Sequence, residues 1–310
     1  MNKIFNISGT LLLTAILLLT AACSSDSSND VQPSPTPDNS QEITLNPTVW
    51  QMMEGRRATT YDAGTLTSGS FTAAAYVANS TTAYINPIQV NWNTSQWEWS
   101  DGKHYWPASG NLDFFAYMPA TIPSYIKNSS SVASSLDYYA TSSPSVTHTV
   151  SFSADLSSGA DTEFVFALTT GQNKTTPGAS GVTLNFLHPF ARVKFATGSV
   201  PSTVTINSVT LDGVMTKGDY SYNGSTSTWS SQSTSGSIDG RDNWIIVVPY
   251  NNSTQTLTVN CTWSEWSNVT KNLTASITAN WAASTSYTYT LNISKDYALT
   301  VDTSKYTEQW

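Results

Sequence analysis

Charged residues are scarce in this chain, at 11% of its 310 residues, which is less than half of the share that soluble proteins usually carry. Because helices in water present lysine, glutamate and arginine on their outer face, this scarcity argues against a helical fold. The 13 lysines and arginines are outnumbered by 21 aspartates and glutamates, which gives a net charge of −8. Nucleic-acid partners require a basic face, so none is expected.

Reactive and metal-binding side chains are also few. Cys23 and Cys261 are the only cysteines, and we predict Cys261 to be a small buried apolar side chain rather than a reactive thiol. His104, His148 and His188 are far apart and lack metal-ligand spacing. No nucleophile elbow, P-loop or dinucleotide-binding glycine motif is present. The chain is therefore predicted to be no enzyme and to need no metal or cofactor, although a glycosidase-like pair of distant carboxylates stays open as an alternative.

The first 22 residues are typical of an export signal. Lys3 precedes an apolar stretch at 11–20 (LLLTAILLLT) that is too short to span a bilayer. The small residues before Cys23 resemble the lipobox of bacterial lipoproteins, in which the cysteine carries lipid such as palmitate, although Thr20 stands where a leucine is usual. The alternative is an ordinary cleaved signal with a chance cysteine. In either case the chain leaves the cytoplasm.

Residues 23–40 are rich in serine, aspartate and proline and show no apolar periodicity. Such a composition predicts a disordered tether. Its acidic start, with Asp26 and Asp30, resembles the signal that sends some lipoproteins to the outer face of the outer membrane. We therefore expect a lipid-anchored precursor at the cell surface.

The rest of the sequence has the two-residue alternation of β-strands, and no window shows helical periodicity over three turns. The clearest alternating windows lie at 71–77, 182–186, 257–263 and 287–293. Residues 244–248 (WIIVV) form a continuous apolar run typical of a strand inside a core. Asn223-Gly224 predicts a hairpin with a two-residue type I′ turn.

The pattern predicts an all-β chain, for which packed sandwiches are the default architecture. The polar segment 170–181, which contains glycine and proline, is the best internal boundary. We therefore predict an N-terminal β-sandwich domain at 41–172 and a C-terminal one at 180–310.

Eleven tryptophans raise the possibility of glycan binding, because sugar rings stack on exposed aromatic faces. Trp97 with Trp99, or Trp263 with Trp266, are the candidate glycan contacts. The favoured interpretation is that these rings pack in the core, where aromatic side chains bury large areas.

Two segments resemble the fimbrillin (Mfa-like) family, the subunits of type V pili. They are 105–107 (YWP) continued by 112–119 (LDFFAYMP), and 184–195 (LNFLHPFARVKF). Weaker similarity occurs at Trp229 and at 286–293. The resemblance implies two tandem Greek-key, transthyretin-like β-sandwich domains in a stalk or tip subunit of surface fimbriae with a role in adhesion. His188 within the second segment is expected to be a hydrogen-bonded structural side chain.

The resemblance also implies proteolytic processing, because in this family a protease cuts after an arginine that follows the first strand. Here 43–53 is the expected first strand, and Arg56, Arg57 and Ala58 form the matching site, with cleavage after Arg57. The alternative is a solvated pair of basic residues in a loop. Pro47 removes a backbone donor, so the first strand should lie at a sheet edge or contain a bulge.

In the family, a partner's C-terminal strand then replaces the first strand. The matching donor residues here are Tyr297, Leu299, Val301, Tyr306 and Trp310. The implied partners are other fimbrial subunits, the outer membrane through the precursor's lipid, and a host or glycan ligand. The competing hypothesis is a monomeric glycan-binding surface lipoprotein that is never processed.

Overall fold

The computed structural model describes residues 35–49, 66–80, 82–128, 131–132, 137–139, 148–160, 162–177, 181–240, 242–302 and 307–309. The expected signal peptide, Cys23, the dibasic site at 56–58, Tyr306 and Trp310 lie outside these ranges. The chain divides into the units 1–31 and 32–310, and all described residues belong to the second. Within them, no helix is long and apolar enough to cross a membrane.

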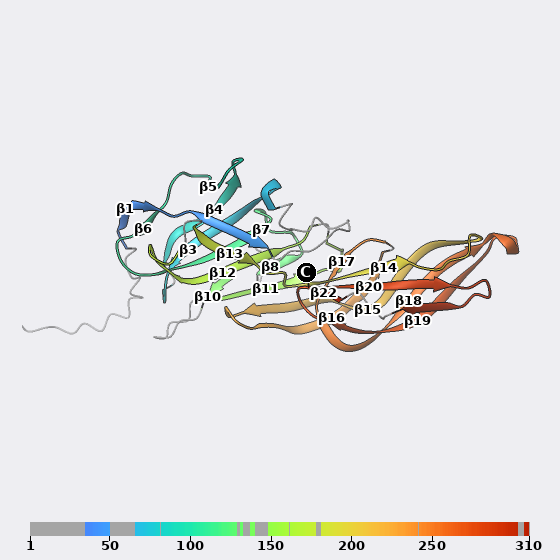
Figure 1. Cartoon of the computed structure of the whole chain (residues 1–310). Helices are drawn as coiled ribbons and strands as arrows, with labels where there is room; N and C mark the ends of the chain where they lie inside the picture. Colours follow the sequence, from blue (N-terminus) through green and yellow to red (C-terminus); the bar gives the residue numbers. More distant parts are fainter. Residues whose placement is uncertain are drawn as a thin grey trace, which may run out of the picture. The chain divides into compact units, whose positions relative to one another are not determined.

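The regular secondary structure of the described residues is almost entirely β-strand, which confirms the all-β prediction (Figure 1). The helical elements among them are two short 3-10 turns, η1 (Leu66–Ser68) and η2 (Ser264–Trp266). All four alternating windows are strands. In 182–186, 257–263 and 287–293 the buried side chains lie at alternate positions, whereas in 71–77 both faces are buried.

Two sheets enclose a first core. The larger has the order β12 (Val165–Gln172), β7 (Leu112–Met118), β3 (Ser70–Val77), β4 (Ala83–Trp92), β5 (Trp97–Trp99). The smaller pairs β13 (Val182–Phe186) with β2 (Leu45–Val49). Phe71, Phe114 and Phe186 are fully buried in their shared core. A separate pair joins β1 (Pro37–Glu42) to β6 (Tyr105–Pro107).

Two further sheets enclose a second core. The eight-stranded sheet contains β19 (Val269–Trp281), β18 (Tyr250–Trp263), β15 (Val204–Tyr222), β11 (Thr149–Asp155), β8 (Ile126–Asn128) and β9 (Ser131–Val132), with β10 (Asp137–Tyr139) on β11 and β16 (Ser227–Asp239) on β15. The five-stranded sheet contains β17 (Ile245–Val247), β14 (Ala191–Thr197), β20 (Thr285–Ile293) and β21 (Leu299–Asp302), with β22 (Thr307–Gln309) also on β20. Their shared core includes Leu257, Val259 and Leu291.

Strands from the two predicted domains share sheets and hydrophobic cores. β11 pairs with β15 in the eight-stranded sheet, and Val182, Leu184 and Phe186 of β13 pack in the first core. A third cluster also combines both halves, because Phe152 packs near Phe190. The division into two tandem Greek-key sandwiches therefore stays a prediction.

Two local expectations need correction. The strand β1 begins at Pro37, so residues 37–40 of the expected disordered tether pair with β6 instead. The hairpin after β15 is present, but Tyr222 pairs with Ser227, so its loop has four residues rather than two. The side chain of Asn223 closes this loop by accepting the backbone N–H groups of residues 225 and 226. The expectation of a core strand at 244–248 is confirmed, because Ile246, Val247 and Val248 are buried, and β17 is an edge strand of the described five-stranded sheet.

Candidate functional site

The strand β2 is held along one side only. It pairs in parallel with β13, from Leu45 opposite Val182 to Val49 opposite Phe186. No strand among the described residues pairs with its other side. The side chains of Ile43 and Leu45 are 1% and 6% exposed and lie in the first core. This N-terminal segment therefore completes the core as its outermost strand.

Pro47 lies on the outer edge of β2. The N–H of Val182 donates to the carbonyl oxygen of Thr44 at 2.9 Å, and alternate residues of a strand direct their backbone groups to the same side. The backbone groups of even-numbered residues therefore face β13, and the nitrogen of Pro47 faces outward. The proline costs no ladder hydrogen bond there, and the predicted edge position is confirmed. The missing N–H also makes this edge a poor template for another strand.

Polar contacts tie the N-terminal strands to their surroundings. The ammonium of Lys103 lies 2.6 Å from the carboxylate of Glu42, and that of Lys174 lies 3.0 Å from the carboxylate of Asp38. The indole N–H of Trp99 donates to the carbonyl of Ile43 at 3.2 Å. The hydrogen bond from Ser40, followed by that from Lys174, lowers the pKa of Asp38 to about 2. Both ion pairs are partly exposed, so they stabilise the N-terminal segment less than the burial of Ile43 and Leu45 does.

A cavity of about 910 Å³ lies beside β2. Its lining includes Leu45, Asn46, Trp92, Gln96, Trp97 and Trp99. Trp97 and Trp99 thus point to the same side of their strand, as expected. The ring of Trp97 is half-buried, 4.9 Å from that of Phe71 and 5.5 Å from that of Trp92 between centroids. These rings contribute to packing and also line the cavity.

The second tryptophan pair is different. The ring of Trp263 is fully buried in the second core and meets the ring of Tyr297 edge-on, with centroids 4.6 Å apart. It has no exposed face for a sugar, so the packing interpretation holds for this residue. The backbone of Trp266 lies in η2, and its side chain lies outside what the structure describes.

The C-terminal strand is held on its own subunit. β21 pairs with the end of β20, with Leu299 opposite Ile293 and Val301 opposite Leu291. The side chains of Leu299 and Val301 are half-buried against the second core. β22 continues along β20 from Thr307. Among the described strands, β20 is the sole partner of β21, which gives the C-terminal segment the same one-sided attachment as β2.

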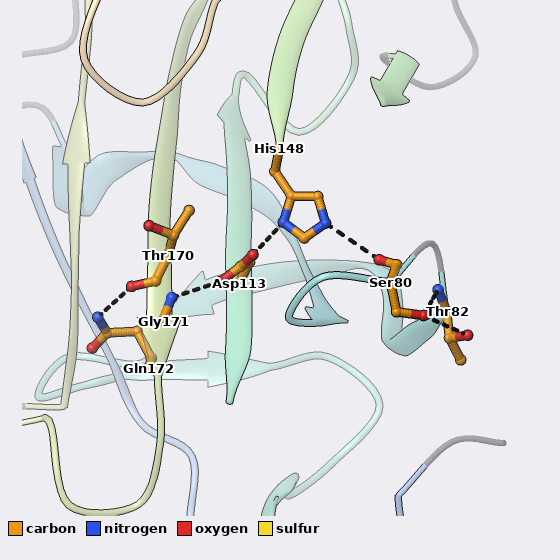
Figure 2. A network of polar contacts seen from close by, with 7 residues as sticks. All are labelled: Ser80, Thr82, Asp113, His148, Thr170, Gly171 and Gln172. Atoms are coloured by element: carbon orange, nitrogen blue, oxygen red, sulfur yellow. Dashed lines mark hydrogen bonds and ion pairs between the residues drawn. The ribbon is translucent and has the colours of Figure 1, made fainter. Parts of the chain in front are cut away.

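A buried ion pair that the sequence did not predict lies on the face of β7 opposite the first core, because Asp113 alternates with the first-core residues Leu112 and Phe114 (Figure 2). Asp113 on β7 contacts Nδ1 of His148, whose Nε2 lies 3.2 Å from the carbonyl oxygen of Ser80. The other carboxylate oxygen of Asp113 accepts the N–H of Gly171 at 2.6 Å. Asp113 therefore joins three segments rather than capping a turn. A carboxylate inside the apolar segment LDFFAYM was the available signal, because a buried charge requires a partner.

His188 is the second buried imidazole. Its Nδ1 contacts a carboxylate oxygen of Glu163, and both side chains are almost completely buried. Its carbonyl oxygen also accepts the hydroxyl of Ser284 at 2.8 Å. The prediction of a hydrogen-bonded structural role is confirmed. The prediction that Cys261 is a small buried side chain is also confirmed, because Cys261 is fully buried in the second core.

Both imidazole–carboxylate pairs are closed off from solvent. The side chains of His148 and Asp113 are 0% and 7% exposed, and those of His188 and Glu163 are 1% and 0% exposed. The described residues also contain no group of three or more metal-ligating side chains. The candidate functional site considered below is the pair of strands β2 and β21, each of which has one strand partner among the described residues.

Solved structures with low sequence identity are similar to this chain over most of its length. A candidate cell adhesion protein from Bacteroides uniformis is similar over 85% of this chain and 99% of its own, with a TM-score of 0.50 and 16% identity. A fimbrial assembly protein from Parabacteroides distasonis has a TM-score of 0.37 at 10% identity, covering 84% of this chain and 98% of its own. The tip fimbrial protein Mfa3 from Porphyromonas gingivalis has a TM-score of 0.40 at 8% identity, covering 78% and 94%. At these identities the likeness concerns the fold alone.

No curated protein matches the sequence. A family model described as fimbrillin-like matches residues 57–310, which is most of the chain. The match includes both segments whose motifs indicated this resemblance, and it ends with the last residue of the C-terminal strand region. This chain therefore belongs to the fimbrillin-like family.

Proposed function

We propose that this protein is a structural subunit, in the stalk or at the tip, of cell-surface fimbriae with a role in adhesion. Family membership and the names of the similar solved proteins support this proposal. The observation that carries the assembly mechanism is that β2 and β21 each have a strand partner on one side only among the residues that the structure describes. A strand held this way can be exchanged without dismantling the rest of its sheet.

The precursor travels as a lipoprotein. Signal cleavage leaves a lipid on Cys23, and the tether holds the folded domain at the outer membrane surface. Cleavage after Arg57 then releases residues 23–57, which include β1 and β2. Loss of this segment uncovers Val182, Leu184 and Phe186, together with the unpaired backbone groups of β13. Each large apolar side chain exposed this way costs about 1.5–3 kcal/mol, which drives capture of another strand.

The C-terminal segment of a neighbouring subunit supplies that strand. Leu299 and Val301 alternate as apolar anchors, and Tyr306 and Trp310 continue the pattern in sequence. Backbone hydrogen bonds supply affinity in such β-strand addition, and pockets for alternate side chains supply specificity. Fibres form in this way without covalent links between subunits.

The mature N-terminus tests this mechanism. Mass spectrometry of subunits from assembled fimbriae should find chains that begin at Ala58. Lipidated Cys23 in every assembled subunit would contradict the processing step. If the unaltered chain is found on cells only in its uncleaved form and in no fimbriae, the subunit role itself is contradicted.

The cavity beside β2 supports a second candidate function, a monomeric surface lipoprotein that binds glycans. Its volume suits a small ligand, and it combines indole rings with hydroxyl and amide groups. Under this hypothesis the full-length monomer binds polysaccharide on a glycan array, and Trp97→Ala weakens binding. Asn207→Ala, at an exposed site on β15, is the control. This alternative would be contradicted if the two variants bound polysaccharide equally well, or if the full-length monomer bound none.

A further inference from the structure

The turn between β20 and β21 is fixed to its own subunit by several independent contacts. Tyr297 lies in this turn, and its ring packs edge-on against the buried Trp263 of β18. The ammonium of Lys271 on β19 lies 3.7 Å from the centroid of the same ring. Tyr297 is thus held between two strands of the opposite sheet, by an aromatic contact and a cation–π contact.

The backbone of the turn is equally constrained. Tyr297 has a φ of +65°, a conformation that non-glycine residues rarely adopt. It persists only where the surroundings hold it. The hydroxyl of Ser294 supplies such a hold by accepting the N–H groups of Asp296 and Ala298. The N–H of Ser294 in turn donates to the carbonyl of Ala298 at 2.9 Å, which closes the turn.

A surface ion pair adds a further tie. The ammonium of Lys295 lies 3.6 Å from the carboxylate of Glu265, which belongs to η2 at the end of β18. The two side chains are 67% and 37% exposed. This contact contributes little stability, but it reports on whether the turn remains against η2.

We infer that the turn at 294–298 stays closed on its own subunit during assembly, and that the segment that crosses to the next subunit begins at Leu299. This inference rests on the proposed strand exchange. It assigns Tyr297 to anchoring rather than donation, because opening the turn would break both ring contacts and the Ser294 hydrogen bonds. Leaving the turn closed sacrifices the pairing of β21 and β22 with β20 and the packing of Leu299 and Val301 against the second core.

The consequence is a fixed exit point for the donor. If the turn opened, the residues from Ser294 onward would lengthen the connection between subunits, and the spacing along the fibre would vary. With Tyr297 anchored, each donor leaves its subunit at the same place. Tyr297 is therefore a positioning residue for assembly.

Carbodiimide cross-linking tests the inference, because this reagent joins neighbouring ammonium and carboxylate groups. It activates the carboxylate of Glu265, the neutral amine of Lys295 attacks, and an amide forms while the reagent leaves as a urea that carries the carboxylate oxygen. The reaction is run on the monomeric precursor and on fimbriae sheared from cells that produce the chain. Mass spectrometry then measures each link within a subunit.

Two other ion pairs serve as internal references. Lys217 and Asp155, 2.9 Å apart on β15 and β11, should link equally in both samples. Lys103 and Glu42 should link in the precursor and not in fimbriae, because Glu42 belongs to the segment released by cleavage. The Lys295–Glu265 link should persist in fimbriae at the precursor level relative to the Lys217–Asp155 link. Its loss from fimbriae would overturn the fixed turn, whereas persistence of the Lys103–Glu42 link would overturn the proposed removal of the first strands.

Variants of Tyr297 test whether its side chain holds the turn at 294–298 in place. Tyr297→Phe keeps the ring and should leave the Lys295–Glu265 link unchanged. Tyr297→Ala removes both ring contacts and should reduce this link in precursor and fimbriae, with the Lys217–Asp155 link unaffected. An undiminished Lys295–Glu265 link in Tyr297→Ala would show that Tyr297 does not hold the turn.

Discussion

At the scale of single residues, the buried charged side chains depend most strongly on their contact partners. Asp113 lies in a strand whose side chains are otherwise apolar, and it is balanced by His148 and by the N–H of Gly171. Such a group stabilises the fold only while all its partners are in place. It joins β7, β12 and the start of β11, which are distant in sequence.

Asp113→Ala should therefore destabilise the protein strongly. The substitution leaves the buried imidazole of His148 without its carboxylate, and removing one member of a buried ion pair costs about 3–5 kcal/mol. Urea unfolding would measure the change in the free energy of unfolding. Asp212→Ala, at an exposed site on β15, is the control and should change it by less than about 0.5 kcal/mol. Equal effects of the two variants would contradict the structural role of Asp113.

Asp155 gives a pH-dependent prediction. The hydrogen bond from the Ser157 hydroxyl, followed by that from Lys217, lowers its pKa from 3.8 to about 2 despite partial burial. A carboxylate with a lowered pKa in the folded state stabilises the fold above about pH 4, and this contribution is lost as the pH falls toward 2. Asp155→Asn should thus lower the melting temperature at pH 7, by an amount equivalent to about 1 kcal/mol or less. The difference from the parent chain should shrink near pH 2.

Lys217→Met provides the companion measurement, since it removes a partner of the same carboxylate. Its effect on the melting temperature should also be larger at pH 7 than near pH 2. A pH-independent effect of Asp155→Asn would show that the carboxylate charge is not what stabilises this site.

At the scale of elements, the attachment of β21 to β20 decides whether a donor is available. Asn292 lies opposite Thr300 in this pair, so cysteines at both positions can form a cross-strand disulfide. We expect the oxidised double variant to fold and to stop donating its C-terminal segment. Polymer length would be measured before and after addition of reductant, which should restore assembly.

The single variants Asn292→Cys and Thr300→Cys are the matched controls, and neither should shorten the polymer under oxidising conditions. The native Cys261 does not interfere, because it is fully buried. Undiminished polymer from the oxidised double variant would exclude exchange of this strand.

Element positions were largely predictable from the sequence. The alternating windows are strands because local patterning and burial agree there, as in 182–186, where each second side chain is buried. The tether boundary was missed because residues 37–42 lack an apolar pattern and pair with β6 through their backbone. The length of the loop after β15 was predicted wrongly, because the Asn223 side chain, rather than a pair of residues with positive φ angles, closes this loop.

At the scale of the whole molecule, the dibasic site decides whether the chain stays anchored. The double substitution Arg56→Ala, Arg57→Ala should leave a full-length lipidated precursor on the cell and abolish its entry into fimbriae. Immunoblots of sheared fimbriae and of cell membranes would show the redistribution. Arg241→Ala, which removes an arginine elsewhere in the sequence, should change neither. Normal fimbriae from the double variant would contradict processing at this site.

The organisation of the whole molecule was harder to infer than its strands. The segment 170–181 resembles a boundary because it is polar and contains glycine and proline. The residues after it nevertheless fill the first core through β13, and a single sheet contains both β11 and β15. Strand pairing between distant segments follows from complementary apolar faces and free edges, which a linear pattern does not reveal.

The all-β fold, the family motifs and the burial of Cys261 were predictable from the amino-acid order, and Pro47 restricted its strand to a sheet edge or a bulge. These follow from local rules, since alternation, backbone donors and composition act on neighbouring residues. The tertiary structure alone decided which partners meet: Asp113 with His148, β2 with β13, and Tyr297 with Trp263 and Lys271. These contacts join residues that are far apart in the chain, so they exist only once the sheets have packed.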